Sequence, residues 1–416
     1  MDVQFLGGAG EVGRSGILLK GKKNMLLDYG VKLDTKIEYP MNAGRVDAFI
    51  LSHAHLDHSG NAPALYSSGS PVSFGTPPTL KLSELLLEDS MKISRKNRVA
   101  HRFSKRDYRN FQRKYVSYDY KVPIDFGEYQ ISLHDAGHIS GSSMPLIEDA
   151  HSGKRLLYTG DFKLSPQLLR HGAEIVKADV LITESTYATS EHPDRRTLEK
   201  AFIDDVKQTI ENKGTALVAV FAVGRAQELL ALLYNNRLID FTYVDGMAKK
   251  ASDIAMQYPG YIDNESLLRG AMDRVNRVGD HEGRGNALAG GNIIVTTAGM
   301  LNGGPILNYI LKLGPASKIF LTGYQVETTN GRKLMEGRPV EIDGQKHRIN
   351  TPWAFYDFSA HADKNDLYRF VREVSPQKVL CVHGDRDNSR DMAEALKLEG
   401  FDAHAPLVGE RLRIDI

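Results

Sequence analysis

Three histidines and one aspartate crowd into a single stretch of the chain, Ser-His-Ala-His-Leu-Asp-His-Ser-Gly over residues 52–60. Neutral imidazole and carboxylate are ligand types that suit zinc, and no cysteine lies nearby to suggest an iron–sulfur or thiolate site. The chain has 14 histidines in 416 residues, so a loop that is merely rich in histidine is an improbable explanation. We predict that His53 and His55 bind one metal ion. Asp57 and His58 turn away from that pair and are predicted to reach a second ion beside it.

These side chains need a rigid element to hold them, and the sequence places one directly before them. Residues 46–51 read Val-Asp-Ala-Phe-Ile-Leu, an apolar run that predicts a buried strand. The histidines begin where this strand should end. We therefore expect their imidazoles to project from the carboxyl edge of a sheet into a loop, where ligands are commonly placed.

The spacing H-x-H-x-D-H resembles the second motif of the metallo-β-lactamase superfamily. Further matches follow the expected order: Asp28 resembles the first motif, Gly137-His138 the third and Thr159-Gly160-Asp161 the fourth. A Gly-Asp pair at a strand end is often only a turn, but four matches in order, each after a strand-like stretch, are specific. The resemblance implies that His138 is a ligand, that Asp161 bridges two metal ions and that Asp28 orients the ligands from behind.

Composition bounds the kind of protein. A chain of 416 residues with 41% apolar content can bury two cores, and its length suggests two or three domains. A net charge of +1 excludes a histone-like polycation, so nucleic-acid binding would have to come from a local groove. The single cysteine, Cys381, excludes internal disulfides and fits a reducing compartment. With no signal peptide and no long apolar span, we expect a soluble cytoplasmic protein that does not contact a membrane.

The N-terminal stretch contains a G-x-G-x-x-G pattern over residues 8–13. A dinucleotide site would require a helix directly after the glycines. The residues that follow instead predict a second strand, a turn at residues 21–24 and a third strand, so the pattern is interpreted as the start of a sheet. The same stretch resembles the opening of the RNA-processing branch of the superfamily, where this loop lies near the metal site.

A basic segment lies between the second and third motifs, and its spacing is compatible with a helix. From residue 92 to 114 it contains one acid, Asp107, four interleaved or flanking aromatic residues (Phe103, Tyr108, Phe111 and Tyr115) and ten cations: Lys92, Arg95, Lys96, Arg98, Arg102, Lys105, Arg106, Arg109, Arg113 and Lys114. Two interpretations stay open. The segment is either an RNA-backbone track with rings that stack on bases, or a helix that buries its rings and solvates its charges.

The middle of the chain alternates strands with helices, which is typical of a parallel α/β domain. Glycine-rich turns at Gly224-Arg225 and Gly303-Gly304-Pro305 follow predicted strands and open predicted helices, a geometry that can present backbone N–H groups to phosphate. Residues 221–228, 297–301 and 321–325 resemble the β-CASP domain of cleavage-and-polyadenylation-factor nucleases. This resemblance implies RNA or phosphate contacts for Gly224, Arg225, Gly299, Met300, Gly303 and Gly304. At position 298 this chain has Ala298, where many relatives have a residue with a small hydroxyl side chain.

Metal-site patterns return near the C-terminal end. Phe358-Ser359-Ala360-His361-Ala362-Asp363 and Leu380-Cys381-Val382-His383-Gly384-Asp385 resemble β-CASP motifs B and C, and Glu184 resembles motif A. The resemblance implies that His383 is a metal ligand associated with RNA substrates. It also implies that His361, oriented by Glu184, is a general acid, with Asp57 and Asp161 completing the catalytic set.

Together these resemblances cover the whole chain. They imply an α/β fold: a metallo-β-lactamase αββα sandwich from residues 1–186 and 351–416, interrupted by a Rossmann-like β-CASP domain at 187–350. Two Zn²⁺ ions are expected, one held by His53, His55 and His138, the other by Asp57, His58 and His383, with Asp161 between them. No KH-like unit precedes the first strand, so the chain is most similar to short prokaryotic or archaeal members.

The implied activity is zinc-dependent hydrolysis of RNA, with single-stranded RNA in the cleft. Endonucleolytic and 5′-to-3′ exonucleolytic modes both stay open. A non-catalytic RNA-binding scaffold, a small-molecule metallohydrolase and a DNA nuclease are the alternatives. The resemblance also implies a homodimer, and residues 410–416 alternate like an edge strand that could pair with another strand or be covered.

Overall fold

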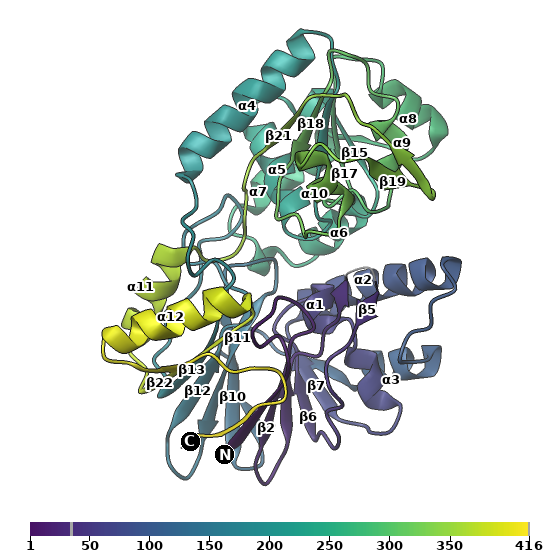
Figure 1. Ribbon diagram of the computed structural model, residues 1–416. Coiled ribbons are helices and arrows are strands. Elements are labelled where there is room, and N and C mark those ends of the chain that lie inside the picture. The colour runs from purple at the N-terminus through teal and green to yellow at the C-terminus, as the bar shows by residue number, and fades with distance from the viewer. Residues whose placement is uncertain (34–35, 415–416) are drawn as a thin grey trace. The chain divides into compact units, whose positions relative to one another are not determined.

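The structure is a computed structural model that describes residues 1–33 and 36–414, and it divides into two compact units (Figure 1). The sandwich unit comprises residues 1–166, 171–191 and those from 361 onward. The inserted unit comprises residues 167–170 and 192–360. Among the described residues, no helix combines the length and apolarity needed to cross a bilayer.

The sandwich unit contains two seven-stranded sheets. The first has the order β24 (Arg411–Arg413), β1 (Asp2–Gly7), β2 (Gly16–Lys20), β3 (Met25–Leu27), β6 (Ala48–Ile50), β7 (Val72–Gly75) and β8 (Tyr115–Ser117). The second has the order β23 (Asp402–His404), β22 (Lys378–Val382), β13 (Val180–Glu184), β12 (Arg155–Tyr158), β11 (Ser143–Asp149), β10 (Tyr129–Asp135) and β9 (Ile124–Phe126). A separate two-stranded antiparallel sheet is formed by β4 (Lys32–Leu33) and β5 (Ile37–Glu38).

Three apolar clusters stack these sheets into four layers. Phe5 and Leu27 of the first sheet share one buried cluster with Leu133 and Ile182 of the second, so the two sheets pack face to face. Helices α2 (Pro77–Lys96) and α3 (Lys105–Lys114) cover the outer face of the first sheet, whereas α11 (Lys364–Val374) and α12 (Arg386–Leu398) cover the second (Figure 1). This helix–sheet–sheet–helix order confirms the predicted αββα sandwich.

The N-terminal glycine pattern precedes a strand, as predicted. β1 ends at Gly7 and pairs antiparallel with β2, which begins at Gly16, so the loop between them joins two strands of one sheet. A dinucleotide-binding helix therefore does not follow these glycines.

The inserted unit is built on a six-stranded parallel sheet. Its order is β16 (Asn276–Arg277), β15 (Thr242–Asp245), β17 (Ile293–Thr296), β14 (Ala216–Ala219), β18 (Lys318–Leu321) and β21 (Trp353–Phe355). The helices are α4 (Arg195–Glu211), α5 (Arg225–Asn235), α6 (Ala248–Met256), α7 (Glu265–Arg274), α8 (His281–Ala287), α9 (Leu307–Ile310) and α10 (Asn330–Met335), with a small hairpin of β19 (Val340–Ile342) and β20 (Gln345–His347). Parallel strands alternating with helices match the expected Rossmann-like insertion.

The end of the insertion differs from the expected boundary at residue 350. β21 pairs in parallel with β18, and Phe358 lies in the core of the inserted unit, which extends to Ala360. Only from His361 does the chain rejoin the sandwich unit. The short apolar sequence of β21 predicts a strand, but it does not indicate which sheet that strand joins.

A buried carboxylate ties the start of the inserted unit together. Glu228 of α5 accepts hydrogen bonds from the backbone N–H groups of Leu168 (3.0 Å) and Leu169 (2.8 Å), and its Oε2 lies 3.4 Å from Arg195 Nη2. Burial raises the pKa of Glu228, while Arg195 and the two amides oppose that shift. The carboxylate is thus a fixed acceptor for two otherwise unpaired donors.

Glu228→Ala is expected to lower the stability of the inserted unit by about 2–4 kcal/mol, because it leaves the buried N–H of Leu169 and the half-buried N–H of Leu168 unsatisfied. The chain's single tryptophan, Trp353, lies on β21 of this unit, so its fluorescence during urea unfolding measures the unit directly. Glu211→Ala, at the exposed end of α4, is the matched control and should stay within about 0.5 kcal/mol. Equal midpoints for the two variants would contradict this role.

Candidate metal centre

The candidate ligands stand at the carboxyl ends of strands in both sheets of the sandwich. Asp28 follows β3, and the His53–His58 stretch follows the neighbouring parallel strand β6, running into the single-turn helix α1 (Leu56–Ser59). In the second sheet, Asp161 follows β12, Glu184 ends β13 and His383 follows β22, three adjacent parallel strands. His138 comes from the β10–β11 connection. Adjacent parallel strands end at one edge, so residues far apart in sequence converge there.

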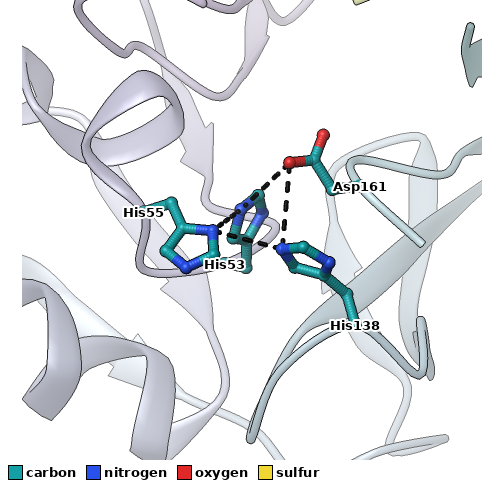
Figure 2. A group of neighbouring side chains, drawn as sticks. All are labelled: His53, His55, His138 and Asp161. Carbon is teal, nitrogen blue, oxygen red and sulfur yellow. Dashed lines mark hydrogen bonds and ion pairs between the residues drawn. The ribbon is translucent and has the colours of Figure 1, made fainter. Parts of the chain in front are cut away.

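The first group contains His53, His55, His138 and Asp161, with one ligand atom from each lying within 4.8 Å of the others (Figure 2). His55 Nδ1 faces His53 Nε2 at 3.2 Å and His138 Nε2 at 3.1 Å. Asp161 Oδ2 lies 3.5 Å from His53 Nε2 and 3.9 Å from His138 Nε2. Ring nitrogens that face one another and a carboxylate form a cage for a cation.

The second group contains Asp57, His58, Asp161 and His383. His58 Nε2 faces His383 Nε2 at 3.2 Å and Asp161 Oδ1 at 3.2 Å, and Asp57 Oδ2 lies 3.4 Å from His383 Nε2. Asp161 therefore offers Oδ2 to the first group and Oδ1 to the second. A carboxylate shared in this way suits two neighbouring cations.

The donor set fits divalent metal ions. Oδ1 of Asp161 is buried and accepts no well-formed hydrogen bond from the described residues. Native proteins rarely leave a buried carboxylate oxygen unsatisfied, and an unoccupied acceptor of this kind indicates an ion or water. The ligands are imidazole and carboxylate without thiolate, which suits zinc.

Asp28 fixes the orientation of the ligand histidines from behind. It is fully buried, and its Oδ2 accepts hydrogen bonds from His58 Nδ1 (2.7 Å), Ser52 Oγ (2.7 Å) and Tyr158 OH (2.9 Å). The Nδ1–H of His58 is thereby engaged, which leaves Nε2 with a lone pair toward the second group. Ser52 Oγ also lies 3.0 Å from His53 Nδ1, so it orients His53 in the same way.

Neither Ser52 nor Tyr158 was predicted to contribute to the site. Ser52 opens the histidine-rich stretch, and Tyr158 ends the apolar strand before Asp161. Burial and the adjacent Asp28 carboxylate raise the pKa of the Tyr158 hydroxyl, which keeps it a donor. In the sequence, these two residues are marked only by a hydroxyl group close to a predicted ligand. That pattern is too common to identify a residue that hydrogen-bonds to Asp28.

Asp28→Asn is expected to weaken zinc binding about 10- to 100-fold, because an amide NH₂ cannot accept the proton that His58 Nδ1 donates. Competition against a chromogenic chelator measures the affinity. Asp125→Asn, on the exposed part of β9, is the control and should bind zinc as the wild type does. Wild-type zinc affinity in Asp28→Asn would show that the carboxylate does not set the histidine tautomer.

His361 and Glu184 form a pair beside the two groups. Glu184 Oε2 and Oε1 lie 2.9 and 3.2 Å from His361 Nδ1, and Oε1 also accepts the Phe162 N–H at 2.8 Å. His361 Nε2 points toward Asp161 Oδ2 at 3.9 Å. Lys163 Nζ donates to the His361 carbonyl and fixes its backbone. Asp161, Glu184 and His361 could themselves hold a cation, but Glu184 already accepts from His361 and Phe162.

The charge state of His361 follows from these neighbours. Burial disfavours its imidazolium form, but the carboxylates of Glu184 and Asp161 outweigh burial and raise its pKa to about 9. Cations at Asp161 oppose this shift because they offset the charge of that carboxylate. The Glu184 pair supports a protonated His361 whose Nε2–H faces the site.

The turns predicted to bind phosphate gather at one edge of the inserted sheet. Loops after β14, β17 and β18 follow adjacent parallel strands, and Gln325 Nε2 donates to the carbonyls of Gly299 (3.1 Å) and Gly323 (2.7 Å). The Met300 carbonyl accepts the Gly331 N–H, and Arg225 Nη1 donates to the Thr322 carbonyl.

Two details of these turns differ from the expected picture. The N–H of Gly224 is engaged by Gln227 Oε1 at 2.7 Å in a capping interaction, so it is occupied within the fold. The helix predicted to open at Gly303-Gly304-Pro305 is a single turn, Leu307–Ile310. Phosphate binding by this edge stays a proposal.

Comparison with known proteins agrees with this geometry. The Metallo-beta-lactamase superfamily model matches residues 9–192, the Beta-Casp domain model residues 226–334, and the Zn-dependent metallo-hydrolase RNA specificity domain model residues 346–406. The chain is 38% identical to Probable RNase MJ4 of Methanocaldococcus jannaschii over the full length of both proteins.

The chain belongs to the metallo-β-lactamase/β-CASP ribonuclease family. It is also 35% identical to RNase aCSPSF2 of Saccharolobus solfataricus, covering 99% of this chain and 85% of that relative. A solved structure of a protein of unknown function from Enterococcus faecalis matches 99% of both chains with a TM-score of 0.62 at 14% identity, which shows the fold alone. This β-CASP protein thus carries the family's His/Asp metal groups on the family's fold.

Proposed function

We propose that this β-CASP protein is a zinc-dependent ribonuclease that hydrolyses RNA phosphodiester bonds. The observation that carries the proposal is the single buried carboxylate of Asp161, which offers one oxygen to each of two histidine groups. Relatives named as RNases over the full length of the chain, and a match to the RNA specificity domain, support RNA as the substrate.

His53, His55 and His138 would hold one zinc, Asp57, His58 and His383 the other, and Asp161 would bridge them. When bound, the two ions lower the pKa of a water to about 7, supply the nucleophile and offset charge on the phosphoryl oxygens. The chain's own residues do the rest: Asp28 and Ser52 hold the ligand rings in place.

His361 is assigned to the leaving group. Its Nε2–H faces the site, and donating that proton to the departing 3′ oxygen would produce a 3′ hydroxyl and a 5′ phosphate. Glu184 keeps the ring oriented through Nδ1. A proton delivered in the transition state contributes about 10² to 10⁴ in rate.

The deciding experiment is a time course on one structured RNA labelled in parallel at its 5′ and 3′ ends. Internal fragments from both labels, removed by chelation and restored by zinc, would establish an endonuclease. Mononucleotide released from the 5′ label alone would establish a 5′-to-3′ exonuclease. No cleavage by zinc-replete protein would favour the non-catalytic scaffold, and equal cleavage of single-stranded DNA would favour a DNA nuclease.

We also propose that the protein acts in the cytoplasm as a homodimer. Its single buried cysteine suits a reducing compartment. β24 pairs with β1 and stands at the edge of its sheet, which leaves one side of that strand for a second copy. Asp415 and Ile416, the end of the stretch predicted to form this edge, lie outside the described residues. Light scattering on the purified protein tests the dimer.

A further inference from the structure

The basic segment of the sandwich unit is unusual in its charge balance. None of its ten cations forms an ion pair within the described part of the chain, and all ten are exposed. Exposed arginines of α11 and α12 behave differently: Arg369 pairs with Glu373, Arg372 with Glu399 and Arg390 with Asp391. A concentration of uncompensated positive charge raises the local concentration of polyanions.

Three carboxylates near this segment are engaged in hydrogen bonds, while Asp89 on α2 interacts electrostatically with Lys92. Asp107, its only acid, accepts hydrogen bonds from Ser104 N (2.8 Å) and Ser104 Oγ (2.7 Å) in the capping box of α3. On α2, Glu84 accepts from Gln112, and Glu88 accepts from the Tyr108 hydroxyl. Asp107 thus caps α3, and Glu84 and Glu88 hold α2 and α3 together; none of these three acids forms an ion pair with the ten cations in the part of the chain that the structure describes.

The rings of the segment are not available for bases. Tyr108, Phe111 and Tyr115 are buried in the cluster between α3 and the first sheet, and Phe103 packs against that cluster. This outcome decides between the two interpretations of the aromatic residues: they are core. The segment consists of two helices, because α2 ends at Lys96 and α3 begins at Lys105. A surface of cations without rings reads phosphate and not base identity.

The cations of α3 form a built surface. Arg106, Arg109 and Arg113 lie at i, i+3 and i+7, and together with Gln112 they line a depression of ≈ 390 Å³. That spacing places them along one helix face over ~10 Å. Guanidinium groups bind phosphate oxygens through two parallel hydrogen bonds, so this face suits consecutive phosphates of a backbone.

Helix α2 sets the distance from this face to the metal centre. Thr76, the N-cap of α2, donates through Oγ1 to the Gly141 carbonyl, three residues from His138. α3 is attached at Glu84 and Glu88, some eight to twelve residues along α2, which corresponds to ~15 Å at 1.5 Å per residue. One RNA molecule can therefore reach both places.

We propose that the arginine face of α3 (Arg106, Arg109 and Arg113) is a second RNA-binding site that holds the phosphate backbone of a substrate whose scissile bond lies at the metal centre. The proposal rests on the proposed ribonuclease function. The site binds without sequence preference and increases affinity for long RNA, and it leaves the chemical step unchanged.

The test uses the full chain carrying Asp161→Ala, so that bound RNA stays intact. Arg106→Gln, Arg109→Gln and Arg113→Gln are combined in one variant. The matched control combines Arg369→Gln, Arg372→Gln and Arg390→Gln, three equally exposed but ion-paired arginines of the same unit. Kd for an RNA of about 30 nucleotides should rise at least about tenfold in the α3 variant alone, and the slope of log Kd against log salt should fall by about 2.

Two further measurements distinguish a loss of phosphate contacts at α3 from a loss of the fold or of the metal centre. An Arg→Lys triple at the same α3 positions keeps the charge but loses the paired guanidinium hydrogen bonds, so its Kd should lie between those of the wild type and the Gln variant. With Asp161 present, hydrolysis of bis(p-nitrophenyl) phosphate, which is too small to reach α3, should be equal in wild type and the α3 variant. Absence of this hydrolysis in the wild type would count against the proposed function, while the binding measurement would still decide the α3 site.

Unchanged RNA affinity in the α3 variant would overturn the inference. The competing partner for a cationic face is an acidic polypeptide. Poly-glutamate binding that disappears in the α3 variant while RNA binding persists would assign the face to such a partner and would likewise overturn the RNA site.

Discussion

Asp161→Ala is expected to lower the rate of RNA cleavage by at least about 10³-fold, because each metal group loses one oxygen of the carboxylate that they share and each ion stabilises the transition state by several kcal/mol. Zinc content should fall below two ions per chain, because each group loses its Asp161 ligand. Three ligands then remain in each group: His53, His55 and His138 in the first, and Asp57, His58 and His383 in the second. Single-turnover cleavage and elemental analysis of the same protein sample measure both effects.

The control for this substitution is Asp125→Ala, on the exposed part of β9 and remote in sequence from the ligands. It should keep wild-type activity and two zinc ions. Full cleavage by zinc-replete Asp161→Ala would mean that the shared carboxylate does not support catalysis, and that the nuclease activity resides elsewhere.

His361→Ala is expected to slow RNA cleavage about 10²- to 10⁴-fold with two zinc ions still bound, because the departing 3′ oxygen loses its proton donor. The substitution removes a ring that pairs with Glu184 at 2.9 Å and lies 3.9 Å from Asp161, without removing a member of either histidine group. Single-turnover rates with saturating protein isolate this step from binding.

A substrate with a better leaving group distinguishes a proton donor from a positioning residue. The p-nitrophenolate of bis(p-nitrophenyl) phosphate departs without a proton, so His361→Ala should lose less than about tenfold on that substrate. His151→Ala, in an exposed turn, is the matched control and should behave as the wild type on both substrates. Equal losses of His361→Ala on both substrates would contradict the role of general acid.

Several features of the site could be predicted from the sequence because they are local. One short stretch contains both an apolar strand and, directly after it, the predicted ligands His53, His55, Asp57 and His58. The residue types and their position at a strand end can therefore be predicted together. The later motifs were recognised through the family resemblance, which implied that their residues converge with this stretch on one metal site. The αββα sandwich was implied by the family resemblance, whereas the parallel inserted sheet was predicted from the alternation of strands and helices in the middle of the chain.

Other features depended on partners distant in the sequence. Ser52 and Tyr158 meet at Asp28 across separations of 24 and 130 residues. The pairing of β3 with β6 brings Ser52 there, and the packing of the two sheets brings Tyr158. β21 joined the inserted sheet because its hydrogen bonds go to β18. The N–H of Gly224, predicted to face phosphate, instead meets Gln227.

By itself the sequence determined the set of candidate metal ligands, because short contiguous motifs specify their types, their order and their positions at strand ends. Only the tertiary structure decided how those groups are oriented and which faces are buried. Tyr108 and Phe111 turned inward while Arg106 and Arg109 stayed exposed and unpaired among the described residues, because burial of a ring is set by the sheet beneath the helix. Orientation and burial depend on the whole packed chain, whereas ligand identity does not.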